Sequence, residues 1–78
     1  MKRWADLDEA IVGMVLTYQD GERVPVVVYS GDKIISILME RDGMEWDDAM
    51  DFVDFNIEGA YTGKDTPLLV WPILEDDE

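Results

Sequence analysis

The sequence contains no cysteine and no histidine. The lack of cysteine excludes a disulfide framework, a thiolate nucleophile and a cysteine-ligated zinc site. The lack of histidine excludes imidazole acid–base catalysis and histidine-ligated metals. Cations are scarce as well, because six lysine and arginine residues stand against 19 aspartate and glutamate residues, a formal charge of -13. Nucleic acid and anionic membranes would repel so acidic a chain, and we expect any protein partner to present a basic surface.

Long hydrophobic runs and targeting signals are also missing. The longest apolar stretches cover residues 24–29 and 67–74 and are too short to cross a bilayer. The basic start Met1-Lys2-Arg3 is followed by acidic residues, where a signal peptide needs an apolar segment. We therefore expect a cytoplasmic protein.

The chain nevertheless has the composition of a folded protein. It has 78 residues, of which 47% are hydrophobic, and three of these are tryptophan. A chain of this length suits one domain with a small core. We expect a single α+β domain over residues 1–74 and a solvated acidic tail over residues 75–78.

Hydrophobic periodicity and turn residues predict the element order β-β-α-α-β. Asp20-Gly21 is a strong signal for a hairpin between the first two strands, and both helices are expected to end at glycine. Pro25 has no N–H to donate, which favours a sheet edge or a bulge at that position. The sequence favours a small antiparallel-rich sheet with a helical hairpin on one face and leaves the strand order open. The expected elements are strands over 10–18, 22–29 and 67–74 and helices over 33–42 and 45–59.

An acidic row follows the second expected helix. The residues of this row have the spacing i, i+4, i+7 and i+11, which places them about 120° from the apolar side on an α-helical wheel. Neighbouring carboxylates would lie about 6 Å apart, and each like-charged pair would cost about 0.2–0.5 kcal/mol. The row is Asp47, Asp51, Asp54 and Glu58, and the apolar side is Trp46, Ala49, Met50, Val53, Ile57 and Ala60.

Two interpretations of this row stay open. It is either a solvated face of an acidic protein or a surface that meets a row of lysine and arginine side chains. Its spacing is close to that of phosphates along a nucleic-acid strand, so such a row would suit the nucleic-acid-binding groove of another protein.

Phe55 lies beside the acidic row on the same wheel, nearly opposite the apolar side. Either the loop over residues 61–67 folds back over Phe52, Phe55 and Gly59, or Phe55 is an exposed anchor ringed by carboxylates. The candidate partner-binding residues are therefore Asp47, Asp51, Asp54, Phe55 and Glu58.

The sequence offers little for catalysis. Paired-carboxylate chemistry needs two carboxyl groups in a cleft, which an exposed acidic row does not provide. The glycines fit no phosphate-binding loop, and the acidic residues do not alternate as a calcium loop requires. We therefore expect no enzyme activity, no catalytic, cofactor-binding or metal-ligating residue and no cofactor.

Two motifs in residues 39–67 are specific enough to compare with known sequences. The first is Arg41-Asp42-Gly43-Met44, and the second, more specific one is Phe55-Asn56-x-x-Gly59-Ala60-Tyr61-x-Gly63-x-x-Thr66-Pro67. Together they resemble a group of small uncharacterised proteins of phages and prophages. The resemblance implies a shared fold unit and a phage context, and it transfers no catalytic residue. The chain departs from the group in having aspartate where glutamate is usual in the second helix and in its acidic tail.

These observations lead to two hypotheses of different classes. The first is a small acidic phage-type protein that binds and inhibits a host protein through the acidic helix face, with a nucleic-acid-binding defence complex as the candidate target. Anti-CRISPR and anti-restriction proteins offer the analogy, since many are small, acidic and without enzymatic motifs. The alternative is a non-enzymatic structural or accessory module that acts as a homo-oligomer, joined through an open strand edge or Phe55.

Overall fold

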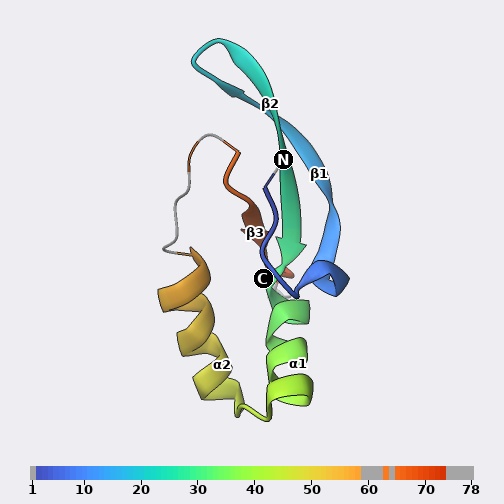
Figure 1. Ribbon diagram of the computed structural model, residues 1–78, viewed down its shortest axis with the longest axis vertical. Coiled ribbons are helices and arrows are strands. Elements are labelled where there is room, and N and C mark those ends of the chain that lie inside the picture. The colour runs from blue at the N-terminus through green and yellow to red at the C-terminus, as the bar shows by residue number, and fades with distance from the viewer. Residues whose placement is uncertain (1, 59–62, 64, 74–78) are drawn as a thin grey trace, which may run out of the picture.

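The computed structural model describes residues 2–58, 63 and 65–73 of the chain. The fold is α+β, and the element order β-β-α-α-β is confirmed (Figure 1). A 3₁₀ turn precedes the first strand, and a π-helix follows the second helix. The elements are η1 (Asp8–Ala10), β1 (Ile11–Gln19), β2 (Glu22–Ser30), α1 (Gly31–Asp42), α2 (Trp46–Phe52), η2 (Val53–Glu58) and β3 (Leu68–Val70).

The three strands form one mixed sheet in the order β1-β2-β3. β1 and β2 are antiparallel, whereas β3 runs parallel to β2. β3 pairs only with the last three residues of β2, Val28 to Ser30. β3 is thus shorter than the predicted strand over residues 67–74, and Pro72 follows soon after its end. The parallel pairing requires a crossover, and α1, α2 and η2 form it (Figure 1).

The hairpin between β1 and β2 forms at the predicted dipeptide. Asp20 and Gly21 both have positive φ, 55° and 82°, which is the geometry of a two-residue type I′ turn. Pro25 faces Leu16 in the ladder and lies outside the segment of β2 that pairs with β3. Among the described strands, β2 therefore has no second neighbour at Pro25. The N–H that proline lacks is not needed there for a hydrogen bond to a third strand.

Local signals set both ends of α1. The Ser30 hydroxyl accepts a hydrogen bond from the Lys33 N–H at 3.1 Å, and the helix begins at Gly31, two residues earlier than predicted. It ends at Asp42, as predicted, and Gly43 follows in the left-handed conformation with φ 72°.

The second helical segment is not one regular α-helix. α2 ends at Phe52, and the chain continues as a π-helix through Glu58. A π-helical turn closes i→i+5, so each residue advances less around the axis than in an α-helix. Ala49, Val53 and Ile57, which the sequence places on the apolar side, are nevertheless all buried. The predicted glycine stop at Gly59 lies outside the described residues.

The core forms where one face of the sheet meets the helices and the N-terminal segment. Its largest fully buried side chain is Tyr29, whose ring lies against Trp4 with centroids 4.6 Å apart. The Tyr29 hydroxyl accepts a hydrogen bond from the Trp4 backbone N–H at 2.9 Å, so this contact ties the N-terminal segment to β2. The buried cluster is Leu7, Ala10, Val27, Tyr29, Ile34, Ile35, Leu38, Ala49, Val53 and Ile57.

Figure 1 shows α1 and α2 side by side beyond the end of β2, while the hairpin tip extends away from them. The end of the hairpin near the helices therefore packs against the rest of the protein, whereas its tip is exposed to solvent. Within the described part of the chain, no helix has the length and apolar character needed to span a bilayer.

Candidate protein-binding surface

The predicted acidic residues lie on the outside of α2 and η2. Asp47 and Asp51 belong to α2, Asp54 belongs to η2, and all three side chains are exposed. Glu58 is the last residue of η2, and its side chain is not among those the structure describes. We refer to Asp47, Asp51, Asp54 and Phe55 as the acidic face.

The geometry of the acidic face differs from the predicted row in one respect. The prediction assumes a regular α-helix over residues 45–59, whereas π-helical turns begin at Val53. Asp47 and Asp51 keep the four-residue spacing of an α-helix, but Asp54 and Glu58 no longer follow that register. The acidic face is thus a patch over two helical segments and not one straight line of carboxylates.

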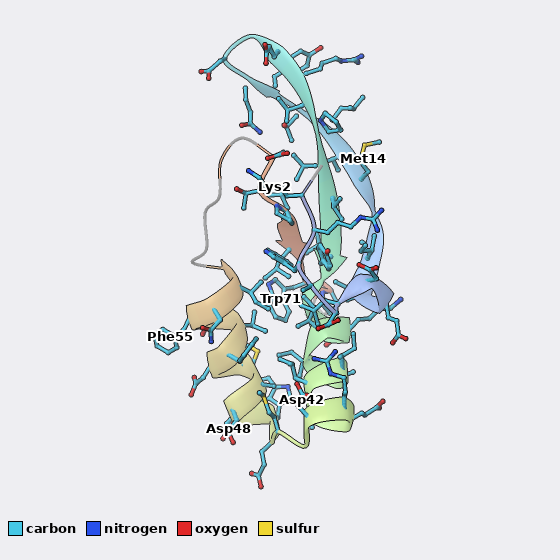
Figure 2. All side chains as sticks on the ribbon, in the orientation of Figure 1. Lys2, Met14, Asp42, Asp48, Phe55 and Trp71 are labelled. Carbon is cyan, nitrogen blue, oxygen red and sulfur yellow. The ribbon has the colours of Figure 1, made fainter. Side chains whose placement is uncertain are left out.

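Phe55 is the most unusual member of this patch. Its side chain is 80% exposed, and it projects away from the rest of the molecule (Figure 2). Phe52, three residues earlier, is half-buried against the core. This exposure contradicts the explanation in which the loop over residues 61–67 covers Phe55, and it agrees with the exposed alternative. An aromatic ring in water next to carboxylates is a feature that folding does not require.

The carboxylates of the acidic face have no cationic neighbour in the described structure. Ion pairs among the described residues include Lys2 with Asp65, Arg3 with Asp8 and Arg41 with Asp42. A fourth cation, Arg23, lies over the Tyr18 ring in the hairpin. The sequence of α2 and η2 itself contains no lysine or arginine. Within the part of the chain that the structure describes, no ion pair therefore neutralises the acidic face.

A second acidic surface was not predicted from the sequence. It is an open hollow of about 510 Å³ between the N-terminal segment and α1. Its carboxylates come from two segments about 30 residues apart, so no local spacing indicates it. No group of three or more described side chains has the geometry to hold a metal ion. The hollow is lined by Asp6, Asp8, Glu9, Ile37, Glu40 and Arg41.

The prediction for Trp46 is wrong, because its side chain is 56% exposed at the first position of α2. It lines an apolar hollow of about 260 Å³ together with Trp71, labelled in Figure 2. Trp71 lies against α1 at Gly31, where an added Cβ would be only 2.5 Å from Cη2 of the indole ring. The close approach therefore requires glycine at position 31. The other residues lining the hollow are Asp32, Ile35, Met50 and Pro72.

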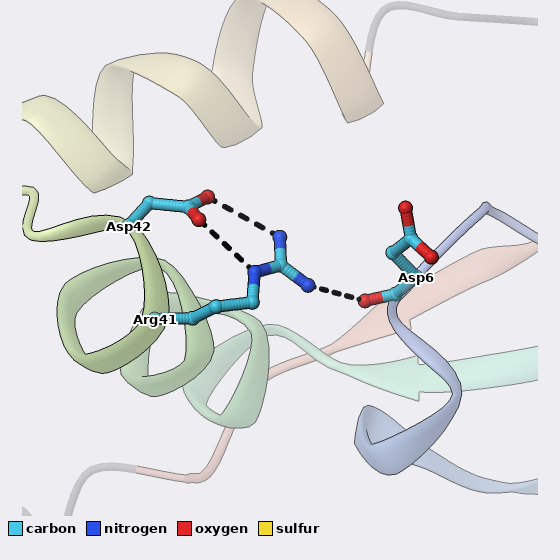
Figure 3. Close-up of polar contacts among 3 residues, drawn as sticks. All are labelled: Asp6, Arg41 and Asp42. Carbon is cyan, nitrogen blue, oxygen red and sulfur yellow. Dashed lines mark hydrogen bonds and ion pairs between the residues drawn. The ribbon is translucent and has the colours of Figure 1, made fainter.

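Arg41 holds the C-terminal end of α1 to the N-terminal segment (Figure 3). Its Nη1 donates to the Asp6 carbonyl at 2.8 Å, while Nε and Nη2 donate to the two Asp42 carboxylate oxygens at 3.0 and 3.2 Å. Asp6 itself adopts a positive φ of 61°. The hydrogen bond from Arg41 holds the pKa of Asp42 below its ordinary value, and desolvation opposes this effect.

We expect Arg41→Gln to raise the pKa of Asp42 toward its ordinary value, since the hydrogen bond that lowers it is lost. Because the pKa of Asp42 is lowered in the folded state, the pair stabilises the fold above the unfolded pKa of about 3.9. That stabilisation is lost as the pH falls through the folded pKa. A carboxyl NMR titration measures the shift. Asp65 is the internal control, since its pKa is lowered by Lys2 and should stay unchanged. An unchanged Asp42 titration would contradict the assignment.

Comparisons with known proteins add no family to this description. No protein-family model matches the chain, and no curated protein or solved structure matches it either. The resemblance to small phage and prophage proteins stays a prediction, and function has to be argued from the surface itself.

Proposed function

We propose that this protein is a non-enzymatic binder that occupies a basic surface of another protein through its acidic face. The observation that carries the proposal is the 80% exposed ring of Phe55, which lies in a segment with exposed carboxylates and no cation. Buried aromatic side chains surrounded by polar contacts are the usual centres of binding energy in protein interfaces. Phe55 would be the anchor, and Asp47, Asp51 and Asp54, which precede it along α2 and η2, would contact cations of the partner on one side of the ring.

The electrostatics of the isolated protein support this role. Like charges on one helical face repel each other, and contact with lysine or arginine side chains would relieve that repulsion. No ion pair among the described residues has to break first, because the described cations lie elsewhere. The net charge of -13 would also steer a basic partner toward the protein and raise the association rate at low salt.

The partner we propose is a host protein whose basic groove normally binds nucleic acid. Asp47 and Asp51, four residues apart on α2, approximate the spacing of backbone phosphates. The acidic face would therefore compete with nucleic acid for the same lysine and arginine side chains. The protein would then inhibit its target by blocking that groove, as anti-CRISPR and anti-restriction proteins do by analogy. The resemblance to phage proteins supports a host defence complex as the target and the host cytoplasm as the location.

A non-enzymatic role is supported by the character of the polar side chains. Catalytic groups commonly combine burial with a strongly shifted pKa. Among the residues that the structure describes, no charged side chain is buried, and the buried hydroxyl of Tyr29 is engaged in its hydrogen bond from the Trp4 N–H. The carboxylates of the acidic face are exposed, which suits binding better than acid–base chemistry.

The test is capture of host proteins from a nuclease-treated bacterial lysate, followed by titration of the captured protein. We expect capture at low salt and release as ionic strength rises. Asp51→Lys combined with Asp54→Lys should weaken binding more than about a hundredfold, because like charges then face each other across the interface. Phe55→Ala should weaken it about fivefold or more through loss of the anchor.

The matched control reverses two charges elsewhere. Glu9→Lys combined with Glu40→Lys makes the same change in net charge but lies at the N-terminal hollow. It should slow association at low salt and leave the affinity within about tenfold of the wild type near physiological salt. Deletion of residues 75–78 should behave in the same way. Equal losses of affinity in the two double variants would show that only net charge matters, and unchanged affinity in the Asp51–Asp54 variant would refute the proposal.

A further inference from the structure

The outer edge of the sheet is an uncharged strand with exposed apolar side chains. β1 is the first strand in the order β1-β2-β3, so among the described strands it has a neighbour, β2, on one side only. Its nine residues, Ile-Val-Gly-Met-Val-Leu-Thr-Tyr-Gln, include no charge and no proline, although the chain carries a net charge of -13. Met14 projects from the hairpin in Figure 2. The exposed large side chains of β1 are Val12, Met14, Val15, Leu16 and Tyr18.

These side chains occupy both faces of the sheet. Met14, Leu16 and Tyr18 alternate with Val15 along the strand, so they point to the opposite face from it. Met14 and Leu16 are both 51% exposed, and Tyr18 is 73% exposed. Apolar side chains of β1 are therefore exposed on both faces of the hairpin, although such side chains are normally buried on at least one face.

The other edge of the same sheet is protected. β3 has three residues and is preceded by Pro67 and followed, two residues after Val70, by Pro72. A short strand flanked by residues that cannot donate a hydrogen bond is a poor template for another strand. β1 is three times as long and contains no proline. Its only irregularity is a shift of the pairing register between Ile11 and Gly13. From Gly13 to Gln19 its ladder is regular, so the open edge extends over that segment.

We propose that two copies of the chain pair antiparallel along β1, around a twofold axis at Val15, and form one continuous six-stranded sheet. In an antiparallel pair, every second residue of an edge strand directs its N–H and C=O away from the existing neighbour, and a second copy satisfies these groups. A twofold axis uses the same surface on both copies, so the strand has to complement itself.

The sequence of β1 meets that requirement. With the axis at Val15, Met14 lies opposite Leu16 of the partner subunit, and Gly13 lies opposite Thr17 of the partner subunit. Val15 lies opposite Val15 of the partner subunit. Each large apolar side chain thus meets an apolar one, and the smallest residue meets a β-branched one. Cross-strand apolar pairs of this kind stabilise antiparallel sheets.

Charge distinguishes this interface from the acidic face. Two copies that each carry -13 repel each other, but β1 itself adds no charge to the contact. Added salt screens this repulsion, so pairing along β1 should strengthen with ionic strength. Binding of a basic partner at the acidic face should weaken with ionic strength. The two interactions therefore respond to salt in opposite directions, and either one can fail without the other.

Sedimentation velocity of the full chain tests the proposal. We expect a dimer whose dissociation constant falls at least about tenfold between about 0.05 M and about 0.5 M salt, where the Debye length becomes short. Leu16→Lys should raise the dissociation constant at least about tenfold at both salt concentrations, although it lowers the net negative charge. Phe55→Ser is the matched control on the other exposed apolar surface and should dimerise as the wild type does. Circular dichroism confirms that both variants fold.

A cross-linking experiment tests the register, because the chain has no native cysteine. Val15→Cys places one thiol opposite its own copy, at a Cβ separation of about 4.5–5.5 Å, close to disulfide geometry. Tyr18→Cys is the control, since its copy would lie about 20 Å away along the paired strands. We expect mild oxidation to give a covalent dimer for Val15→Cys and little for Tyr18→Cys.

Three results would overturn the proposal. A monomer at every concentration and salt would exclude pairing with a second copy and leave β1 to a strand of another protein. A Leu16→Lys variant that dimerises like the wild type would place the interface elsewhere. Equal cross-linking of Val15→Cys and Tyr18→Cys would exclude the register centred on Val15.

Discussion

Replacement of Tyr29 by alanine is expected to abolish cooperative folding or come close to it. Tyr29 is fully buried at the centre of the core, and its ring packs against Trp4. Truncation of a buried aromatic side chain typically costs about 3–5 kcal/mol, because apolar contacts are lost and a cavity remains. A chain of this length has a total stability of about 4–12 kcal/mol, so the loss removes a large part of it.

Tyr29→Phe is the matched control. The ring and its contacts stay, but the Trp4 backbone N–H loses the acceptor at 2.9 Å. We expect a loss of about 0.5–1.5 kcal/mol, the usual net value of one hydrogen bond. Urea denaturation followed by tryptophan fluorescence measures both variants. Equal losses in Tyr29→Ala and Tyr29→Phe would mean that the hydroxyl, and not the packing of the ring, provides the stability.

The second large effect is expected at Val53, the first residue of the π-helix. Val53 is fully buried, and it contributes to the core with Ala49 and Ile57. We expect Val53→Ala to lower the free energy of unfolding by about 1–3 kcal/mol through lost apolar burial and the resulting cavity. Thermal and urea unfolding of the isolated protein give the value.

Phe55→Ala provides the control within the same helical segment. The larger side chain is removed, but from an 80% exposed position, so the stability should change by less than about 0.5 kcal/mol. Val53→Ala is thus expected to lower the stability more than Phe55→Ala, although it removes fewer atoms. This expectation depends on the orientation of η2. If Phe55→Ala proved more destabilising than Val53→Ala, η2 would be turned the other way and the acidic face would lose its anchor.

Several parts of the fold were determined by the sequence itself. Asp20-Gly21 specified the hairpin because a type I′ turn needs positive φ at both central positions, and aspartate and glycine accept positive φ at low cost. Ser30 and Gly43 marked the ends of α1 because a hydroxyl cap and a left-handed residue act on the nearest turn. The acidic, cation-poor character of α2 and η2 was equally visible, since it depends on composition alone. All these signals act over a few residues and need no distant partner.

Helical periodicity correctly placed Asp47, Asp51 and Asp54 on the outside but made two errors. It put Trp46 on the apolar side, and it continued the α-helical register through residues 53–58. A helical wheel assumes one constant angle per residue, and the change from α-helix to π-helix at Val53 breaks that assumption.

The tertiary structure alone decided which surfaces are available for binding. The pairing of β3 with β2 depends on contacts between residues about 40 positions apart, and it leaves β1 as the open edge of the sheet. The exposure of Phe55 depends on what packs over η2, and the acidic hollow depends on the approach of the N-terminal segment to α1. Long-range packing determines these features. Short segments encode turns and helix ends, whereas the order of the strands is stabilised only by the side-chain packing of the assembled core.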